Sequence, residues 1–332
     1  MKLPIETKNP LFGLYLYPAA KEIMEKQQDI GWFAQEIKVE KDIQDYKVNM
    51  DAHSYELVQV TLQLFVEIEQ NVGDIWTKIE SWFPHSEIEG ACSVISSMEK
   101  SVHAFFYQKM SDVLNINPED TLKAQTTVTA LREKLEFLNS ILKNASDNKP
   151  LTLATISMIE QVLLFSNFAM LKSFQANGNN LIPNTISGVD YVINDEVLHG
   201  EFASYLFTTY TTEALEVDSN YDMVDLVNKI YIVAEEIIKH EDAVIDYLFV
   251  TDDRYINGVN SAQLKSFIRH RVNYVLNSIG INDKDVVEND TIAKWFYKGA
   301  NAIKMHDFFV KGTNSYSRTW SEDSFTRLGV MK

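Results

Sequence analysis

The chain has 332 residues, of which 45% are hydrophobic and 23% are charged, the ordinary composition of a globular protein. Its formal net charge of −17 argues against a nucleic-acid-binding surface, which is basic, and against docking on anionic lipid. With a single cysteine, Cys92, the chain can form neither an intrachain disulfide nor a cysteine-built zinc site. We expect Cys92 to be a small apolar residue of the core. No signal peptide and no run of about 18 uncharged apolar residues is found. We therefore expect a cytoplasmic protein that binds neither nucleic acid nor membrane.

Glycine (12) and proline (7) are scarce for this length, which predicts helices joined by short turns. Residues 1–30 carry three prolines, and we expect an extended arm there. The chain from residue 310 to 332 lacks helical periodicity and is expected to be a flexible tail behind a helical body of residues 1–309. The spacing of apolar residues predicts an all-α bundle of about eight long helices, at residues 54–76, 87–114, 119–144, 151–175, 189–210, 223–249, 261–278 and 291–302.

The stretch Val189–His199 carries the clearest sign of chemistry. Glu196 and His199 lie three residues apart in an otherwise apolar helical run, so both side chains share one helix face. A buried carboxylate beside a buried imidazole is costly unless both are paired or bind a metal. This pair therefore directs attention to other residues that could share the site.

A second helix carries Glu99, His103 and Tyr107, spaced by four residues each time and so stacked along one stripe. Two further helices each hold a glutamate within an apolar stretch, Glu160 in one and Glu69, or alternatively Glu67, in the other. Four carboxylates and two imidazoles from four helices form the ligand set known from dinuclear metal sites in helical bundles. Carboxylates bridge and neutralise two hard cations, and imidazoles suit iron or manganese.

Each of these residues could also occur in a helix without binding a metal. A single glutamate in a helix is usually solvated. Glu236 and His240 provide an internal comparison, because they have the same residue types at helical spacing but are flanked by charged residues, including Glu241. We expect that pair to lie on a solvated face. The case for a metal site therefore depends on all four helices together.

The segment Asn194-Asp-Glu-Val-Leu-His199 is similar to the Arg-Asp-Glu-x-Leu-His motif of the radical-generating small (β) subunit of class I ribonucleotide reductase. His103-Ala-Phe-Phe-Tyr107 matches the His-x-x-x-Tyr of that family, and Asn180–Ser187 resembles the turn before its ligand helix. Residues Trp32–Asp42, with Tyr46, resemble its N-terminal tryptophan segment. The resemblance runs from about Trp32 to the tail and implies a ferritin-like bundle.

The resemblance implies a function and roles for particular residues. The chain would be the small subunit of a ribonucleoside-diphosphate reductase, which serves deoxyribonucleotide synthesis for DNA replication. Its centre of two metal ions, iron by first expectation and manganese or a mixed pair as alternatives, would oxidise Tyr107 to a stable radical with an oxygen species. Leu164, Phe168 and Val192 would keep the radical's surroundings apolar. The metal ligands would be Glu69, Glu99, His103, Glu160, Glu196 and His199.

An electron path to a catalytic large (α) subunit is also implied. It would run through His103, Asp195 and Trp32 to a tyrosine of the tail, best matched by Tyr316, with Trp320 as the alternative. Asp195 would accept a hydrogen bond from a ligand imidazole. The tail would dock on the large subunit, the chain would form a homodimer, and an activating flavoprotein is a further possible partner.

Three departures from the family pattern bear on these roles. Glu69 stands where the family commonly has aspartate, and Asn194 stands where it has arginine. The usual Glu-x-x-His is here Glu99-Lys-Ser-Val-His103, one residue longer, so strict spacing would put Lys100 at the ligand position. We favour Glu99, because residues four apart still share a helix face and a π-bulge can absorb one extra residue.

Two other functions compete with this interpretation. A stand-alone dinuclear-metal oxidase or oxygenase would share the fold and the ligands, but would have no need for Trp32, Asp195, Tyr107 or a tail tyrosine. An iron-storage or purely structural bundle is a third possibility. The length of the chain and its tail argue against it, since storage proteins assemble from shorter single bundles.

Overall fold

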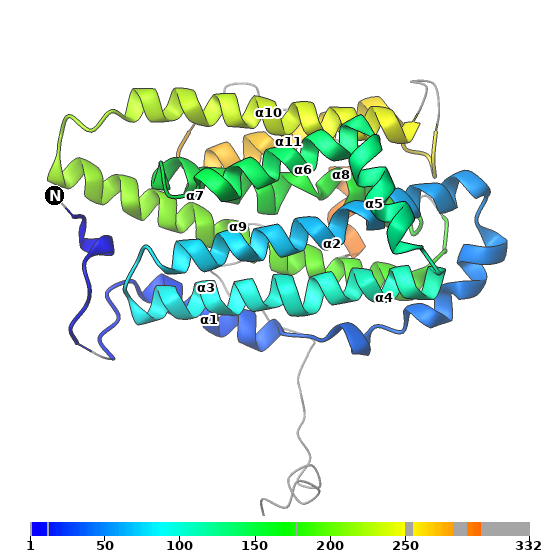
Figure 1. The fold of residues 1–332 in the computed structure, drawn as a ribbon, viewed down its shortest axis with the longest axis horizontal. Helices are drawn as coiled ribbons and strands as arrows, with labels where there is room; N and C mark the ends of the chain where they lie inside the picture. The colour runs from blue at the N-terminus through cyan, green and yellow to red at the C-terminus, as the bar shows by residue number, and fades with distance from the viewer. Residues whose placement is uncertain (1, 12, 177, 250–254, 282–290, 300–332) are drawn as a thin grey trace, which may run out of the picture. The chain divides into compact units, whose positions relative to one another are not determined.

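The computed structural model describes residues 2–11, 13–176, 178–249, 255–281 and 291–299. Within these ranges the chain is almost wholly helical, and the only β pairing is an isolated bridge between Ile256 and Val259. The helices are shown in Figure 1: α1 Pro18–Ile30, α2 Ala52–Glu80, α3 Ser86–Met98, α4 Ala104–Leu114, α5 Pro118–Thr127, α6 Thr129–Asn144, α7 Lys149–Met158, α8 Phe165–Ser173, α9 Pro183–Val217, α10 Met223–Phe249, α11 Ser261–Ser278 and α12 Ala293–Gly299. The expected boundary at residues 309 and 310 lies outside the described residues.

Two of the expected long helices continue through a π-helical turn. The turn Glu99–His103 (η5) joins α3 to α4, and the turn Ile159–Leu163 (η6) lies between α7 and α8. Such turns hold one residue more than an α-helical turn and recur at functional sites. Here each of them contains residues of the expected ligand set.

The prediction of an extended arm over residues 1–30 is wrong for its second half. Helix α1 begins at Pro18, which occupies the first turn, where the missing N–H costs nothing. Its buried face is formed by Ala20, Ile23 and Gln27. This stripe is short and ends in a polar residue, so apolar periodicity does not reveal it.

The predicted helix over residues 119–144 is two helices. The chain leaves helical geometry at Val128, whose φ of −82° and ψ of 111° are extended. Val128 follows Thr126 and Thr127 and precedes Thr129, and β-branched side chains lose rotamer freedom in a helix. The break therefore falls on a run of poor helix formers.

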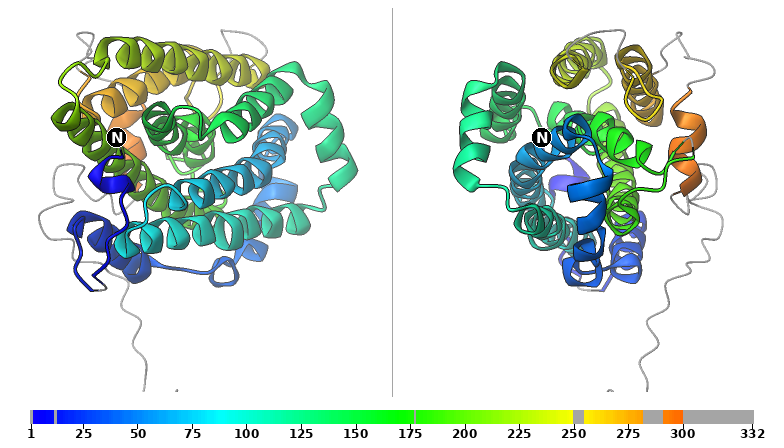
Figure 2. Two further views of the ribbon diagram at one scale, coloured as in Figure 1. Left: turned by 60° about the vertical axis from the view of Figure 1, so that its left-hand side comes forward. Right: turned by 90° about the vertical axis from the view of Figure 1, so that its right-hand side faces the viewer.

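The core of the bundle is made by α2, by α9 and by the two pairs of helices joined through π turns, α3–α4 and α7–α8. Helix α2 packs against α3 and α4, and α9 packs against α7 and α8. Helices α10 and α11 pack on one another and cover the α7–α8 side, and the end-on view in Figure 2 shows the helices arranged around this centre. The stretch Lys149–Ser173 is long and apolar enough to cross a membrane, but its most apolar 18 residues are all buried here in the core of the bundle.

The start of α9 is fixed by two carboxylates from the segment that follows Trp32. Asp42 accepts the backbone N–H of Thr185 at 2.6 Å, and Asp45 accepts that of Ile182 at 2.8 Å. Negative side chains at a helix N-terminus satisfy free N–H groups and complement the helix dipole. The N-terminal segment thus fixes the position of the helix that carries Asp195, Glu196 and His199.

Candidate metal centre

The six expected ligands come together in the middle of the bundle. They fall into two overlapping groups whose ligand atoms lie within 4.8 Å of one another: Glu69, Glu99, His103 and Glu196 in one, and Glu99, Glu160, Glu196 and His199 in the other. All six side chains are buried. Glu99 and Glu196 belong to both groups, as bridging carboxylates between two cations would.

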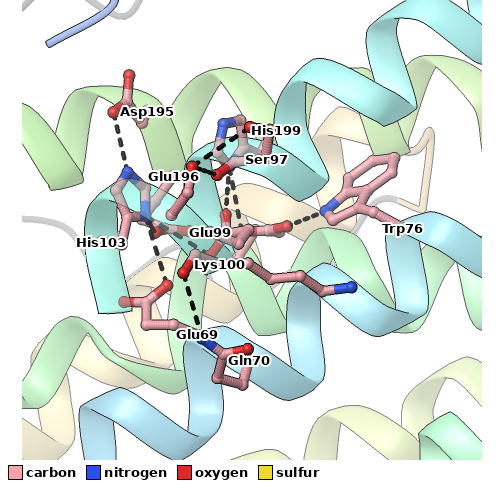
Figure 3. A network of polar contacts seen from close by, with 12 residues as sticks. Glu69, Gln70, Trp76, Ser97, Glu99, Lys100, His103, Asp195, Glu196 and His199 are labelled. Carbon is pink, nitrogen blue, oxygen red and sulfur yellow. Dashed lines mark hydrogen bonds and ion pairs between the residues drawn. The ribbon is translucent and has the colours of Figure 1, made fainter. Parts of the chain in front are cut away.

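Glu99, and not Lys100, points into the cluster. Glu99 Oε1 lies 2.7 Å from His199 Nδ1, and its side chain is 0% exposed. Lys100 is 31% exposed and pairs with Asp74 at the rim; Figure 3 shows it reaching away from the two imidazoles. The extra residue is absorbed by η5, where the N–H of Ala104 donates to the carbonyl of Glu99 across a π turn. Residues four apart therefore converge as a Glu-x-x-His pair would in a regular helix.

Glu69, and not Glu67, is the α2 member of the cluster. Its carboxylate lies 3.4 Å from His103 Nδ1, whereas Glu67 is half-buried and lines a surface groove. Glu160 lies in η6, 3.7 Å from His199 Nδ1, and accepts a hydrogen bond from the indole of Trp76. Sequence reasoning missed Trp76, because nothing in the sequence distinguishes it from a tryptophan that only fills the core.

The donor atoms of the cluster are suited to cations. Each of the six residues has at least one buried oxygen or nitrogen that lacks a hydrogen-bond partner, among them both oxygens of Glu99 and Nδ1 of both histidines. Even the short contact between Glu99 and His199 lacks hydrogen-bond geometry. Unpaired buried polar atoms are costly, and four acidic groups around one space repel one another. Two divalent cations would satisfy these atoms and offset the charge.

The imidazoles are oriented for binding through Nδ1. His103 Nε2 lies 3.0 Å from a carboxylate oxygen of Asp195, and His199 Nε2 lies 3.0 Å from the amide oxygen of Gln27. Each acceptor holds the proton on Nε2 and leaves a lone pair on Nδ1, the arrangement that metal-bound histidines usually show.

The pKa values of the cluster reflect its crowding. Burial, and then repulsion by Glu99, raises the pKa of Glu69 and of Glu196 well above the ordinary glutamate value. Burial alone would lower the pKa of His199, but the nearby carboxylates of Glu160 and Glu99 raise it to about 9. Protons therefore partly neutralise the acidic groups when no cation does.

Tyr107 lies on the same stripe as Glu99 and His103 and is fully buried. Its ring meets Phe65 at 4.6 Å and Phe106 at 5.1 Å between centroids, and Phe65 in turn meets Phe168 at 5.3 Å. The Tyr107 hydroxyl has no hydrogen-bond partner among the described residues. Burial raises the pKa of Tyr107 well above its ordinary value. The ring of Tyr107 is therefore enclosed by aromatic side chains, close enough to the cluster for the charges of Glu69 and His103 to act on its hydroxyl.

Asp195 joins Trp32 to the cluster. The indole N–H of Trp32 donates to Asp195 Oδ2 at 2.8 Å, and the same oxygen faces His103 Nε2. Gln27, which sequence reasoning missed, donates to Asp195 Oδ1 at 2.9 Å and thereby connects the two histidines. The only indication in the sequence that Gln27 is buried is its helical spacing from Ala20 and Ile23. Tyr316 and Trp320 lie outside the described residues.

The pair Glu236 and His240, predicted to lie on a solvated face, is only partly exposed. Glu236 is 45% exposed, as expected, but His240 is 8% exposed and packs on Phe137 at 4.9 Å. Glu241 is fully buried and pairs with Lys134. Flanking charges thus failed to mark a solvated face, because Glu241 has a buried cation as its partner.

Comparison with known proteins identifies the family. Residues 14–284 match the ribonucleotide reductase small chain. A probable ribonucleoside-diphosphate reductase small subunit of Invertebrate iridescent virus 3 is 24% identical over 327 residues, covering 92% of this chain and 84% of the viral one. The ribonucleoside-diphosphate reductase subunit beta of Treponema pallidum (strain Nichols) is 22% identical over 321 residues, covering 93% and 88%.

The fold is shared with solved structures. The dimanganese(II) NrdF of Streptococcus sanguinis superposes with a TM-score of 0.75 at 18% identity, over 87% of this chain and 99% of that one. The predicted all-α, ferritin-like bundle is confirmed, and its carboxylate and histidine cluster fits a dinuclear metal site. Since the family match spans most of the sequence, the chain belongs to the ribonucleotide reductase small-chain family.

Proposed function

We propose that this chain generates and stores the radical of a class I ribonucleoside-diphosphate reductase, with Tyr107 as the oxidised residue. The observation that carries the proposal is a buried phenol on the same helix face as Glu99 and His103, one turn beyond His103 and packed against Phe65 and Phe106. When bound, two metal ions would supply the one-electron oxidation of Tyr107 with an oxygen species as oxidant. Glu69, Glu99, His103, Glu160, Glu196 and His199 would hold them.

The protein's own side chains orient the two imidazoles and exclude water and reductants from Tyr107. Asp195 and Gln27 hold the protons of the two imidazoles on Nε2, and the aromatic and aliphatic side chains around Tyr107 exclude water and reductants. Iron is the metal we expect first. Manganese is supported by the same oxygen and imidazole donors and by the dimanganese(II) form of the Streptococcus sanguinis relative, so a manganese or mixed centre is the alternative.

The contacts of Trp32 favour this function over a stand-alone dinuclear-metal oxidase. A buried indole hydrogen-bonded through Asp195 to His103 forms a continuous link from the cluster toward the N-terminal segment. An oxidase that acts on its own substrate has no need for such a link. We propose that an electron travels along it from the large subunit, with Tyr316 as the tail relay.

The experiment is oxygen activation followed by electron paramagnetic resonance. The full-length chain is loaded with Fe(II) or with Mn(II), exposed to oxygen with and without a reduced flavoprotein, and its spectrum is recorded. A tyrosyl signal is expected in the parent and is lost in Tyr107→Phe. Tyr46→Phe is the matched control, since Tyr46 is also buried but its hydroxyl is hydrogen-bonded to Thr185. Metal uptake without a radical under every condition would refute the radical role.

A second experiment concerns the tail and partner. Removal of the residues after Tyr316 should abolish binding to the large subunit while leaving the Tyr107 signal intact. Normal binding by the shortened chain would refute the assignment of the tail. We further propose a homodimer, which sedimentation of the full-length chain would detect as a species of twice the 38.1 kDa chain mass.

A further inference from the structure

The π turn that carries Glu160 is held by side chains from outside the cluster. The residue after this turn, Leu164, has a φ of −109° and a ψ of −7°, so the backbone leaves regular helical geometry there. Buried carbonyl groups at such a break need donors from elsewhere. Lys134 Nζ donates to the last carbonyl of η6 at 2.6 Å. Arg271 Nε donates at 2.8 Å to the carbonyl of Gln161, the residue directly after Glu160.

Arg271 is an uncommon residue for the core of a helical bundle. Its side chain is 0% exposed, and charged side chains are almost never fully buried unless they are paired. The hydrogen bonds that it makes within the described part of the chain go to neutral oxygens, which belong to Gln161 and to the hydroxyl of Tyr297. Its guanidinium carbon lies 4.3 Å from the ring centroid of Phe165, the first residue of α8. Arg271 therefore holds the chain both within η6 and directly after it.

Gln161 transmits this hold to α9. A Cβ at Gly200 would meet Cγ and Nε2 of Gln161 at 2.4 Å, so the glutamine fills the space that a larger residue at position 200 would need. Gly200 follows His199, and Glu160 precedes Gln161. The contact thus fixes the register of the two elements at the place where Glu160 lies 3.7 Å from His199 Nδ1.

We propose that Arg271 is a positioning residue for the candidate metal centre. Through Gln161, its guanidinium holds η6 so that the carboxylate of Glu160 stays beside His199 in one group of ligands. The other group, which contains His103, includes no residue of η6. Loss of the guanidinium should therefore weaken one metal ion and leave the other bound. The inference rests on the metal centre of the proposed function and does not depend on the radical.

The test is a competitive Mn(II) titration of the full-length chain that resolves two dissociation constants. Glu160→Gln identifies the constant that belongs to the group of Glu160. Arg271→Met removes the donors and should raise that constant by about tenfold, the scale of effect known for residues that orient metal ligands, while the other constant stays near its parent value. Arg271→Lys keeps one donor for the Gln161 carbonyl and should restore part of the affinity. Arg269→Met is the matched control on α11, because Arg269 is 42% exposed and pairs with Asp242, and should change neither constant.

Hydrogen exchange of the metal-free chain provides a second measurement. Backbone amides of η6 and of the turn after it should exchange faster in Arg271→Met, whereas those of η5 should not change, since the hydrogen bonds of Arg271 go to η6. Tyr297→Phe removes only the hydroxyl that holds the other side of the guanidinium. It should produce both effects at smaller size, and it provides the test if Arg271→Met does not fold.

Equal weakening of both metal ions, or unchanged constants in Arg271→Met and Tyr297→Phe, would overturn the proposal. A residue that only stabilises the fold would not select one metal ion over the other. Failure of the radical function would appear differently, as a parent chain that binds two Mn(II) ions but gives no Tyr107 signal with oxygen. A parent chain that does not bind two Mn(II) ions would overturn both proposals.

Discussion

His103 and His199 each have one ring nitrogen bonded to an outer side chain and one directed at the carboxylates. The outer partners differ, Asp195 for His103 and Gln27 for His199. Because such partners fix the tautomer and the ring orientation of a metal ligand, each outer residue should control the metal affinity of its own histidine. The two histidines belong to different groups of the cluster, so the two effects are separable.

Asp195→Asn should weaken the metal bound by the group that contains His103, by about 10- to 100-fold. The new amide would present N–H groups where Trp32 and His103 also donate. Gln27→Leu should weaken the other metal more, because His199 Nε2 loses its acceptor, whereas His103 keeps Asp195, which loses only its contact with Gln27. Competitive Mn(II) titration that resolves two dissociation constants measures both. Equal weakening of both metals by either variant would contradict separate control.

Metal uptake should release protons and become weaker as the pH falls. The pKa values of Glu69 and Glu196 are raised by burial and carboxylate repulsion, and the pKa of His199 is raised to about 9 by its carboxylate partners. Protons on these groups compete with cations, so the apparent affinity falls progressively below about pH 9. Calorimetric Mn(II) titrations in buffers of different ionisation enthalpy measure the released protons. A pH-independent affinity would contradict this assignment of protons.

At the scale of the element, the one-residue excess between Glu99 and His103 is local to η5. A π turn contains an inserted residue, so the helices on either side keep the register of a regular helix. Gly73 of α2 lies opposite this turn, where a Cβ would meet the side chains of Lys100 at 2.8 Å and Glu99 at 3.2 Å. The facing helix thus leaves room for the wider turn.

Deletion of Lys100 should therefore be tolerated. It would give Glu-Ser-Val-His in a regular helix, with α3 and α4 still facing their neighbours, so helicity and uptake of two metals should persist. Deletion of Gln108 in α4 is the matched control. It removes one residue from a regular helix and would rotate Met110 and Leu114 out of the core by about 100°. Circular dichroism and metal analysis compare the two, and loss of metal in the Lys100 deletion would show that the π turn is required.

Much of this architecture could be predicted from the sequence, because long helices with one apolar face leave a strong periodic signal. The predicted bounds of α10 and α11 agree with the structure. Helix α1 could not be predicted, because its buried stripe is short and includes the polar Gln27. Carboxylates and imidazoles are rare on apolar faces, so the sequence indicated the cluster, but the structure was needed to choose Glu69 over Glu67 and Glu99 over Lys100. Trp76 and Gln27 could not be predicted, since their importance lies in contacts with distant parts of the chain.

At the scale of the molecule, the cluster depends on segments far apart in sequence. Gln27 and Trp32 reach Asp195 across more than 160 positions, and Asp42 and Asp45 secure the start of the same helix. The N-terminal residues are therefore part of the centre and not an accessory arm. A second long-range contact, an ion pair, lies on the opposite side of the core, where α6 and α10 meet η6.

This ion pair is formed by the buried side chains of Lys134 and Glu241. Lys134 Nζ binds the Glu241 carboxylate and also the carbonyl of Leu163 at 2.6 Å, and the hydroxyl of Ser166 donates to Glu241. Both charged side chains are fully buried. Burial raises the pKa of Glu241, while Lys134 opposes that rise. Because Leu163 ends the π turn that carries Glu160, the ammonium supports the geometry of the cluster as well as the packing of α6 on α10.

Lys134→Met should lower the free energy of unfolding by about 3–5 kcal/mol, since it leaves a buried carboxylate without its cation. Adding Glu241→Leu should recover part of the loss but not all of it, because the Leu163 carbonyl keeps no donor, at a cost of about 1–3 kcal/mol. Urea unfolding of the three proteins measures this, with Lys229→Met as the control, whose exposed pair with Asp225 should contribute nothing measurable. A double variant no more stable than the single one would show that Glu241 stabilises the core through Ser166 and not through Lys134.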